Sequence, residues 1–153
     1  MDVLIAYESK YGNTKLVAET IGEGMKEVDG INLVIKNIEE IDVPNLDNFD
    51  AILIGSPNHW FKQTRAIAKF INQLATLPLE GKSFAVFDTH LKKPHRHKAV
   101  ERMEDQFKKK MPNMKRIMPG LEVLVSGIKG PIPEGELPKC KEFGNLVATN
   151  LMR

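Results

Sequence analysis

The chain has 153 residues, 42% of them hydrophobic and 27% charged, with a formal net charge of +2 at pH 7. This is typical of one soluble globular domain, expected to span residues 1–153, and the small charge gives no reason to expect a nucleic-acid partner. No apolar run approaches the roughly 18 residues of a membrane span, no secretory leader opens the sequence, and the lone Cys140 cannot form an internal disulfide, so we expect a cytoplasmic protein without a membrane partner.

Short apolar runs alternate with segments of helical periodicity along the chain. The runs predict β-strands at residues 3–6, 33–35, 51–54, 84–87 and 121–125. Apolar side chains at helical spacing predict helices at residues 17–28, 67–74, 100–111 and 140–147. Residues 37–49 leave room for only a turn or two of helix near Pro44. Several runs are nearly continuous rather than alternating, as expected of strands buried on both faces.

This alternation of strands and helices indicates the α/β class. We expect a three-layer, doubly wound fold in which helices cover both faces of a five-stranded parallel sheet. In such folds, ligands bind beyond the carboxyl ends of the strands, where the strand order reverses. The loops to examine are therefore those after the first, third and fourth strands, which we expect to begin at Glu8, Ser56 and Asp88.

The loop after the first strand has the features of an anion site. Ser9, Asn13 and Thr14 bring short polar side chains to a helix start, where backbone N–H groups have no partner, and Gly12 permits close approach of a ligand. The helix dipole favours an anion there. The alternative is simple helix capping by Asn13 or Thr14. Three such residues and a glycine together favour phosphate binding. The glycine motifs of classical dinucleotide and nucleoside triphosphate sites are absent.

This loop resembles the FMN-phosphate loop of flavodoxins, a family whose pattern is roughly Ser or Thr, any residue, Thr-Gly, any residue, Ser or Thr. The matching residues here are Ser9, Lys10, Tyr11, Gly12, Asn13 and Thr14. The resemblance covers the whole chain and implies the strand order 2-1-3-4-5 and a non-covalently bound FMN. Tyr11 departs from the common pattern and loses one hydroxyl donor, for which Lys10 could compensate by its charge.

The resemblance places the flavin ring at the other two loops. After the third strand come Pro57, Asn58, His59, Trp60 and Phe61. Trp60 falls where flavodoxins place an aromatic ring that shields the flavin, and stacking of two large flat rings would favour that role. The alternative is a tryptophan in the core or at a subunit contact.

After the fourth strand come Asp88, Thr89 and His90, whose backbone N–H groups we expect to face the pyrimidine edge of the flavin. Flavodoxins usually supply a second aromatic ring there, which this chain lacks. His95 and His97, with His90 nearby, have no cysteine or close carboxylate to complete a tetrahedral set, so we predict no metal site.

Residues 92–116 hold ten Lys or Arg against three acidic residues, a charge of +7 that leaves −5 for the rest of the chain. One interpretation is a solvated helix face. The other is a basic rim beside the flavin, which predicts acidic redox partner proteins such as ferredoxin-like donors or acceptors. Residues 127–137 resemble a stretch found before the last helix in short flavodoxin-family proteins, and we assign no chemistry to them.

The resemblance thus implies a flavodoxin-like electron carrier, with no catalytic residue of its own. One alternative is an FMN-dependent NAD(P)H:acceptor oxidoreductase, suggested by the possible open flavin face and the basic loop but opposed by the lack of an insertion that could build a substrate pocket. The other is a flavin-free binding module on the same fold, suggested by Tyr11 and the missing second aromatic ring.

Overall fold

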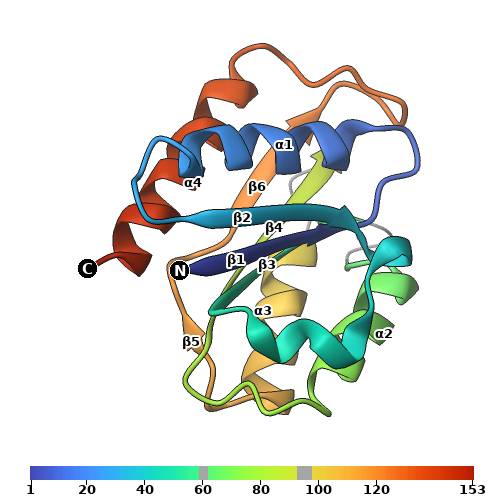
Figure 1. Cartoon of the computed structure of the whole chain (residues 1–153). Helices are drawn as coiled ribbons and strands as arrows, with labels where there is room; N and C mark the ends of the chain where they lie inside the picture. Colours follow the sequence, from blue (N-terminus) through green and yellow to red (C-terminus); the bar gives the residue numbers. More distant parts are fainter. Residues whose placement is uncertain (59–61, 93–97) are drawn as a thin grey trace.

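The computed structural model describes residues 1–58, 62–92 and 98–153. Strands and helices alternate along it, as predicted (Figure 1). In chain order the elements are β1 (Asp2–Tyr7), α1 (Asn13–Met25), β2 (Asn32–Asn37), the 3-10 helices η1 (Ile38–Glu40) and η2 (Val43–Asn48), β3 (Ala51–Pro57), α2 (Arg65–Leu74), β4 (Ser83–Leu91), α3 (Ala99–Lys110), β5 (Lys115–Arg116), β6 (Leu121–Val125) and α4 (Glu136–Leu151).

The sheet is parallel and has the order β2-β1-β3-β4-β5, with β6 also paired to β4. The predicted order is therefore confirmed, but its fifth position is divided between two strands. β5 pairs with the beginning of β4 and β6 with its end, at residues 87–91. Pro119 lies between them and has no N–H to donate to a ladder, which accounts for the interruption.

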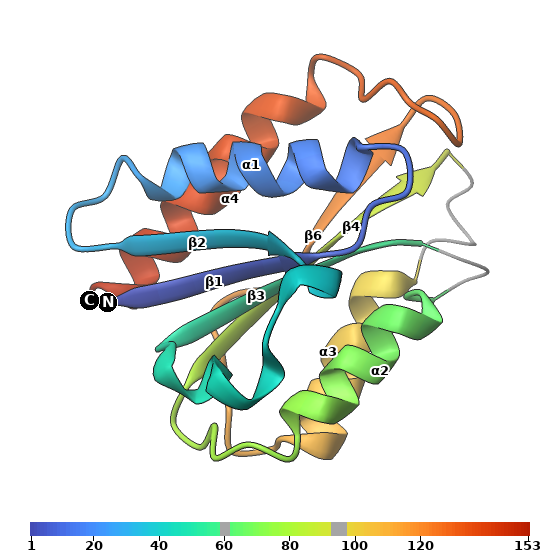
Figure 2. The same cartoon turned by 45° about the vertical axis from the view of Figure 1, so that its right-hand side comes forward.

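Helices cover both faces of the sheet, α1 and α4 on one side and α2 and α3 on the other (Figures 1 and 2). Successive residues of a strand point to opposite faces, so each strand contributes to two cores. Ile5 and Leu53 belong to the core under α1 and α4, while Leu4 and Ile52 belong to the core under α2 and α3. This double burial explains the continuous apolar runs in the sequence.

The helices α1 and α4 pack with their backbones in contact. A Cβ atom at Gly144 of α4 would collide with the carbonyl oxygen of Ile21, and one at Gly24 of α1 would collide with that of Lys141. Both helices therefore need glycine at the crossing. The position of α1, and of the loop that precedes it, depends on this contact.

No helix in the described ranges 1–58, 62–92 and 98–153 combines the length and the apolar character that crossing a membrane requires.

Candidate functional site

The carboxyl ends of β1, β3 and β4 meet at one edge of the sheet, which we call the carboxyl edge (Figure 2). Its interior is polar, in contrast to the apolar cores. Thr14, Ser56, Asp88 and Thr89 lie there, each at most 5% exposed. Burying polar side chains is costly unless they have partners or a function, so this edge is the first place to look for a site.

The loop before α1 forms a notch lined by backbone N–H groups, which we call the α1 notch (residues 9–14). Gly12 occupies the N-cap position with φ +91°, and no other atom lies within 4 Å of where its Cβ would be. No side chain in the described part of the chain caps the helix, and its first turn carries no acidic residue. The first N–H groups of α1 are therefore available to an anion.

Two of the predicted phosphate ligands lie inside the helix rather than at its cap. Asn13 and Thr14 are the first residues of α1, so the alternative of capping by either side chain is wrong. Ser9 contributes instead, because its Oγ accepts the Gly12 N–H at 3.0 Å and stabilises the bend of the loop. The hydroxyl proton of Ser9 stays available to a ligand, since the oxygen here acts as acceptor.

Thr14 connects two parts of the predicted site, the start of α1 and the end of β4. Its Oγ1 lies 3.0 Å from Oγ1 of Thr89 on β4, and both side chains are buried. Asn13 lies against the loop that precedes α4, because a Cβ on Gly130 would lie 2.5 Å from its Oδ1. The loop at residues 127–131 therefore borders the α1 notch.

Tyr11 stands at the rim of the notch, with two ammonium groups near its ring. The residue is 44% exposed, and Lys10 Nζ and Lys129 Nζ lie 5.4 and 5.8 Å from the ring centroid, within the range of cation–π attraction. Lys129 comes from the loop before α4. The sequence reasoning missed it because the contact joins distant parts of the chain. The sequence offered one indication of this contact, which is that Lys129 stands next to Gly130 in a predicted loop.

Asn58 fastens the loop after β3 to the helix α3. Its backbone N–H donates to the Thr89 carbonyl at 2.8 Å, and its Oδ1 accepts the N–H groups of Lys98 and Ala99 at 3.1 and 3.0 Å. It thus caps α3 from another segment. His59, Trp60 and Phe61, which we expected beside the flavin ring, lie outside the described residues, as do His95 and His97.

The loops after β3 and β4 begin later along the chain than the sequence predicts. Ser56 and Pro57 are the last residues of β3, and Asp88, Thr89 and His90 lie within β4. β4 continues to Leu91 because β6 pairs with it along residues 87–91. The prediction of a loop at Asp88 is therefore wrong, and the backbone of these residues is part of the sheet.

Glu8 and Thr64 tie the carboxyl edge to α2. Thr64 caps this helix, its Oγ1 accepting the Ile67 N–H at 3.2 Å and donating to Glu8 Oε2 at 3.0 Å. The Thr64 N–H donates to Ser56 Oγ at 3.1 Å. The starts of α1, α2 and α3 are thus fixed around one edge by polar contacts.

Comparison with known proteins decides the family. Residues 4–122 match the model of a flavodoxin domain. The chain belongs to the flavodoxin family. A curated flavodoxin of Clostridium saccharobutylicum is 33% identical over 89 residues, which is 58% of this chain and 56% of that protein. This chain therefore matches just over half the length of that relative.

Two solved flavodoxins share the fold over nearly the whole chain. A flavodoxin from the domain Archaea superposes with a TM-score of 0.85 at 23% identity, and the match covers 100% of both chains. Flavodoxin 2 from Bacillus cereus, solved in its oxidised form, gives a TM-score of 0.82 at 25% identity and covers 97% of this chain and 99% of its own.

The donors that line the α1 notch fit a phosphate group such as that of FMN. The dianion would meet the free N–H groups at the start of α1, the hydroxyl of Ser9 and the space beside Gly12. The bound FMN would supply redox chemistry, which no side chain described here can perform. Within the described residues, no three His, Cys, Asp or Glu lie together in a way that could hold a metal ion.

A buried Asp–His pair lies on β4 at the carboxyl edge. Asp88 is fully buried, and its Oδ1 lies 3.1 Å from His90 Nδ1 and 3.3 Å from the Val123 nitrogen, while its Oδ2 has no hydrogen-bond partner within the described residues. In the tautomer that donates to Asp88 Oδ1, Nδ1 of His90 carries the proton of this hydrogen bond.

Two opposing effects act on the pKa of His90. Burial lowers it, but the hydrogen bond to Asp88 and the charges of Asp88, Glu122 and Glu136 outweigh burial and raise it above its ordinary value of 6.5. The pair favours a positive charge on His90 near the expected flavin.

The basic segment is divided between two ends of the molecule. The helix α3 runs away from the carboxyl edge, so the cations after its middle lie at the opposite edge (Figure 2). These are Lys108, Lys109, Lys110, Lys115 and Arg116. The prediction that the whole segment forms a rim beside the flavin is therefore wrong. Among the described cations of this segment, only Lys92, Lys98 and Arg102 lie on the side of the carboxyl edge.

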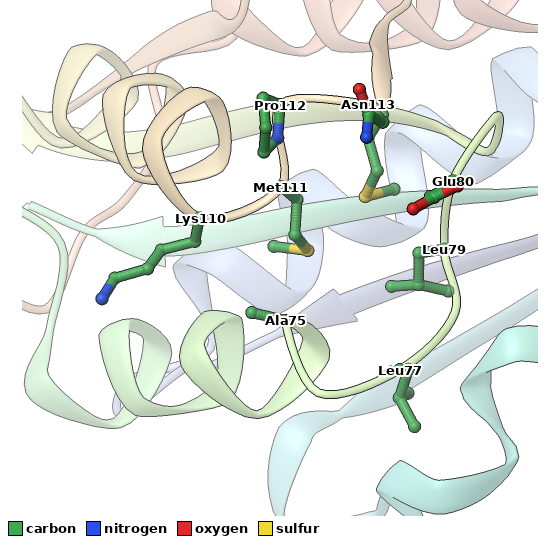
Figure 3. A pocket seen from close by; sticks show the side chains of 9 residues that line it. Ala75, Leu77, Leu79, Glu80, Lys110, Met111, Pro112 and Asn113 are labelled. Atoms are coloured by element: carbon green, nitrogen blue, oxygen red, sulfur yellow. The ribbon is translucent and has the colours of Figure 1, made fainter.

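A hollow of about 150 Å³ lies at this opposite edge, between the end of α2, the loop before β4 and the end of α3 (Figure 3). Met111 lies in the middle of this view, with Lys110 on one side and Leu79 and Glu80 on the other. It contains none of the predicted site residues, so it is not part of the candidate site.

Proposed function

We propose that this flavodoxin-family protein carries electrons on a non-covalently bound FMN. The observation that carries the proposal is the α1 notch, where uncapped N–H groups, an open left-handed Gly12 and the Ser9 hydroxyl converge at the helix start. The relatives support it too, since one of them is described as an oxidised flavodoxin. We also propose that residues 1–153 act as one domain in the cytoplasm, which the full-length match to the archaeal flavodoxin and the buried, single Cys140 support.

The test is a titration of the purified protein with FMN, followed by the fluorescence of the flavin. Stacking and burial of the ring should quench it in a saturable way at one site per chain. Riboflavin should bind more weakly because it has no phosphate for the α1 notch. A colourless protein that leaves the fluorescence of added FMN unchanged would favour the flavin-free binding module instead.

A second assay separates a carrier from an oxidoreductase. The flavin-loaded protein is mixed with NADH or NADPH, and nicotinamide oxidation is followed by absorbance. We expect negligible steady oxidation, because the described elements follow one another without a long insertion that could build a pocket for a second substrate. Rapid turnover by the protein alone would favour the NAD(P)H:acceptor oxidoreductase.

The partners that we propose are acidic redox proteins. Lys10, Lys92, Lys98 and Lys129 place four cations at the carboxyl edge, and these would attract an acidic surface. Electron-transfer rates with an acidic ferredoxin should then fall as ionic strength rises. Rates that stay constant between low and high salt would contradict this proposal.

A further inference from the structure

Lys10 and Lys129 converge on the same aromatic ring from distant parts of the chain. Their ammonium groups lie 5.4 and 5.8 Å from the centroid of Tyr11, which adjoins Gly12 in the α1 notch. The attraction to the ring face holds each long side chain near one place. Two like charges held near one ring also repel each other, and an anion beside them would relieve that repulsion.

Backbone hydrogen bonds close the turn that carries Lys129. The Gly130 N–H donates to the Gly127 carbonyl at 2.9 Å, and the Ser126 N–H donates to the Pro131 carbonyl at 2.9 Å, so residues 127–130 form a closed turn. Gly130 adopts φ +92° and lies against Asn13, the first residue of α1. The turn thus presents Lys129 at the start of α1.

Neither ammonium group has a carboxylate within ion-pair distance among the described residues. Within residues 1–58, 62–92 and 98–153 neither Lys10 nor Lys129 forms an ion pair, although several other lysines and arginines do. The first turn of α1 has no acidic residue either. Two lysines and a helix N-terminus therefore contribute positive potential to the same notch.

We propose that Lys10 and Lys129, held over Tyr11, form a cationic clamp that makes this protein selective for doubly charged phosphate monoesters. This inference rests on the proposed function and deepens it, because it assigns part of the affinity for FMN to charge supplied by the turn before α4. The clamp acts on the phosphate group alone. The clamp should not change the affinity for riboflavin, which lacks the phosphate group.

The experiment measures dissociation constants for FMN and riboflavin in the full-length protein, at low and high salt. Lys129→Gln should weaken FMN binding about 3- to 10-fold at low salt, and the double variant with Lys10→Gln should weaken it further. Both effects should shrink at high salt, while riboflavin binding stays unchanged. Lys129→Arg keeps the charge and should restore most of the affinity.

Lys26→Gln is the matched control. It removes one charge from the other end of the same helix, about 20 Å from the notch for 13 residues. At about 0.1 M salt, which serves as the low-salt condition, the Debye length is about 10 Å, so Lys26→Gln should leave both constants unchanged. Inorganic phosphate, used as competitor, should displace FMN less effectively from the double variant than from the wild type.

Two outcomes would overturn the clamp. Lys129→Gln and the double variant could bind FMN as tightly as the wild type, or both could lose FMN and riboflavin equally, which would mean a purely structural role. Failure of the proposed function looks different, since then the wild type itself would bind no FMN.

Discussion

At the scale of single residues, polar side chains are buried at the carboxyl edge because they have partners there. Thr14 and Thr89 share a hydrogen bond, and Asp88 accepts from His90 and from the Val123 N–H. The pair of Asp88 and His90 also couples stability to pH. A pKa raised in the folded state means that the pair stabilises the fold fully below about pH 6.5 and that this contribution is lost as pH rises through the folded pKa.

The first prediction concerns the pKa of His90. Asp88→Asn removes the adjacent negative charge, so the pKa of His90 should fall relative to the wild type. The measurement is the chemical shift of the His90 ring protons against pH. Asp105→Asn, an exposed carboxyl on α3, is the control and should leave the curve unchanged. Superimposable curves for Asp88→Asn and the wild type would show that the pair does not set this pKa.

Sequence reasoning at this scale worked for local features and failed for contacts through space. Ser9 and Gly12 could be predicted because a helix start needs such residues within a few positions. Lys129 could not be predicted, because its contact with Tyr11 joins distant parts of the chain. The Asp88–His90 pair was missed because these residues were expected in a loop, whereas alternate residues of a strand share one face. The roles expected of Trp60 and its neighbours remain predictions.

At the scale of elements, helix starts are fixed by residues from other segments. Asn58, which follows β3, accepts the N–H groups of Lys98 and Ala99 and so caps α3. The sequence indicated Asn58 as a ligand residue near the flavin, which stays a prediction, and its side-chain oxygen also has this structural task. Such a cap cannot be read from the sequence, because it joins residues about 40 positions apart.

A substitution at Asn58 tests this cap. Asn58→Ala should lower the free energy of unfolding by about 1 kcal/mol, since two N–H groups at the start of α3 lose their acceptor. Asn58→Asp keeps an acceptor and should restore most of the loss. Urea unfolding of the three proteins gives the comparison. If the alanine variant matched the wild type, the cap would contribute nothing.

The crossing of α1 and α4 gives a second prediction for the elements. Gly144→Ala should destabilise the protein by about 2 kcal/mol or more, although alanine favours helix, because its Cβ would collide with the Ile21 carbonyl. Gly127→Ala is the control, with its nearest neighbour at an ordinary 3.5 Å, and should change stability by less than about 0.5 kcal/mol. Equal midpoints in urea for the two variants would exclude a tight crossing.

At the scale of the whole molecule, the fold could be predicted well and the distribution of charge could not. Apolar runs at strand spacing were enough for the α/β class, and the flavodoxin resemblance for the strand order. The run of cations after residue 92 reads as one patch in the sequence. The helix α3 crosses the molecule and brings the later cations of this run to the opposite edge. Cations that are neighbours in the sequence therefore do not form one surface patch.

Binding of FMN should stabilise the whole fold. A ligand that binds only the folded state at 100 times its Kd adds about 2.7 kcal/mol, which raises the Tm by roughly 5–10 °C in a chain of this length. Differential scanning calorimetry with increasing FMN measures this shift. Riboflavin at the same concentration should raise the Tm less. A Tm that does not respond to FMN would contradict a site at the α1 notch.

The close crossing of the first and last helices has a consequence for how the protein matures. α1 begins at the α1 notch and packs on α4, whose residues 136–151 leave the ribosome after every strand of the sheet. All strands of the sheet are therefore synthesised before α4, the helix that packs on α1. We therefore expect capture of a cofactor by this notch to be favoured once α4 has packed against α1.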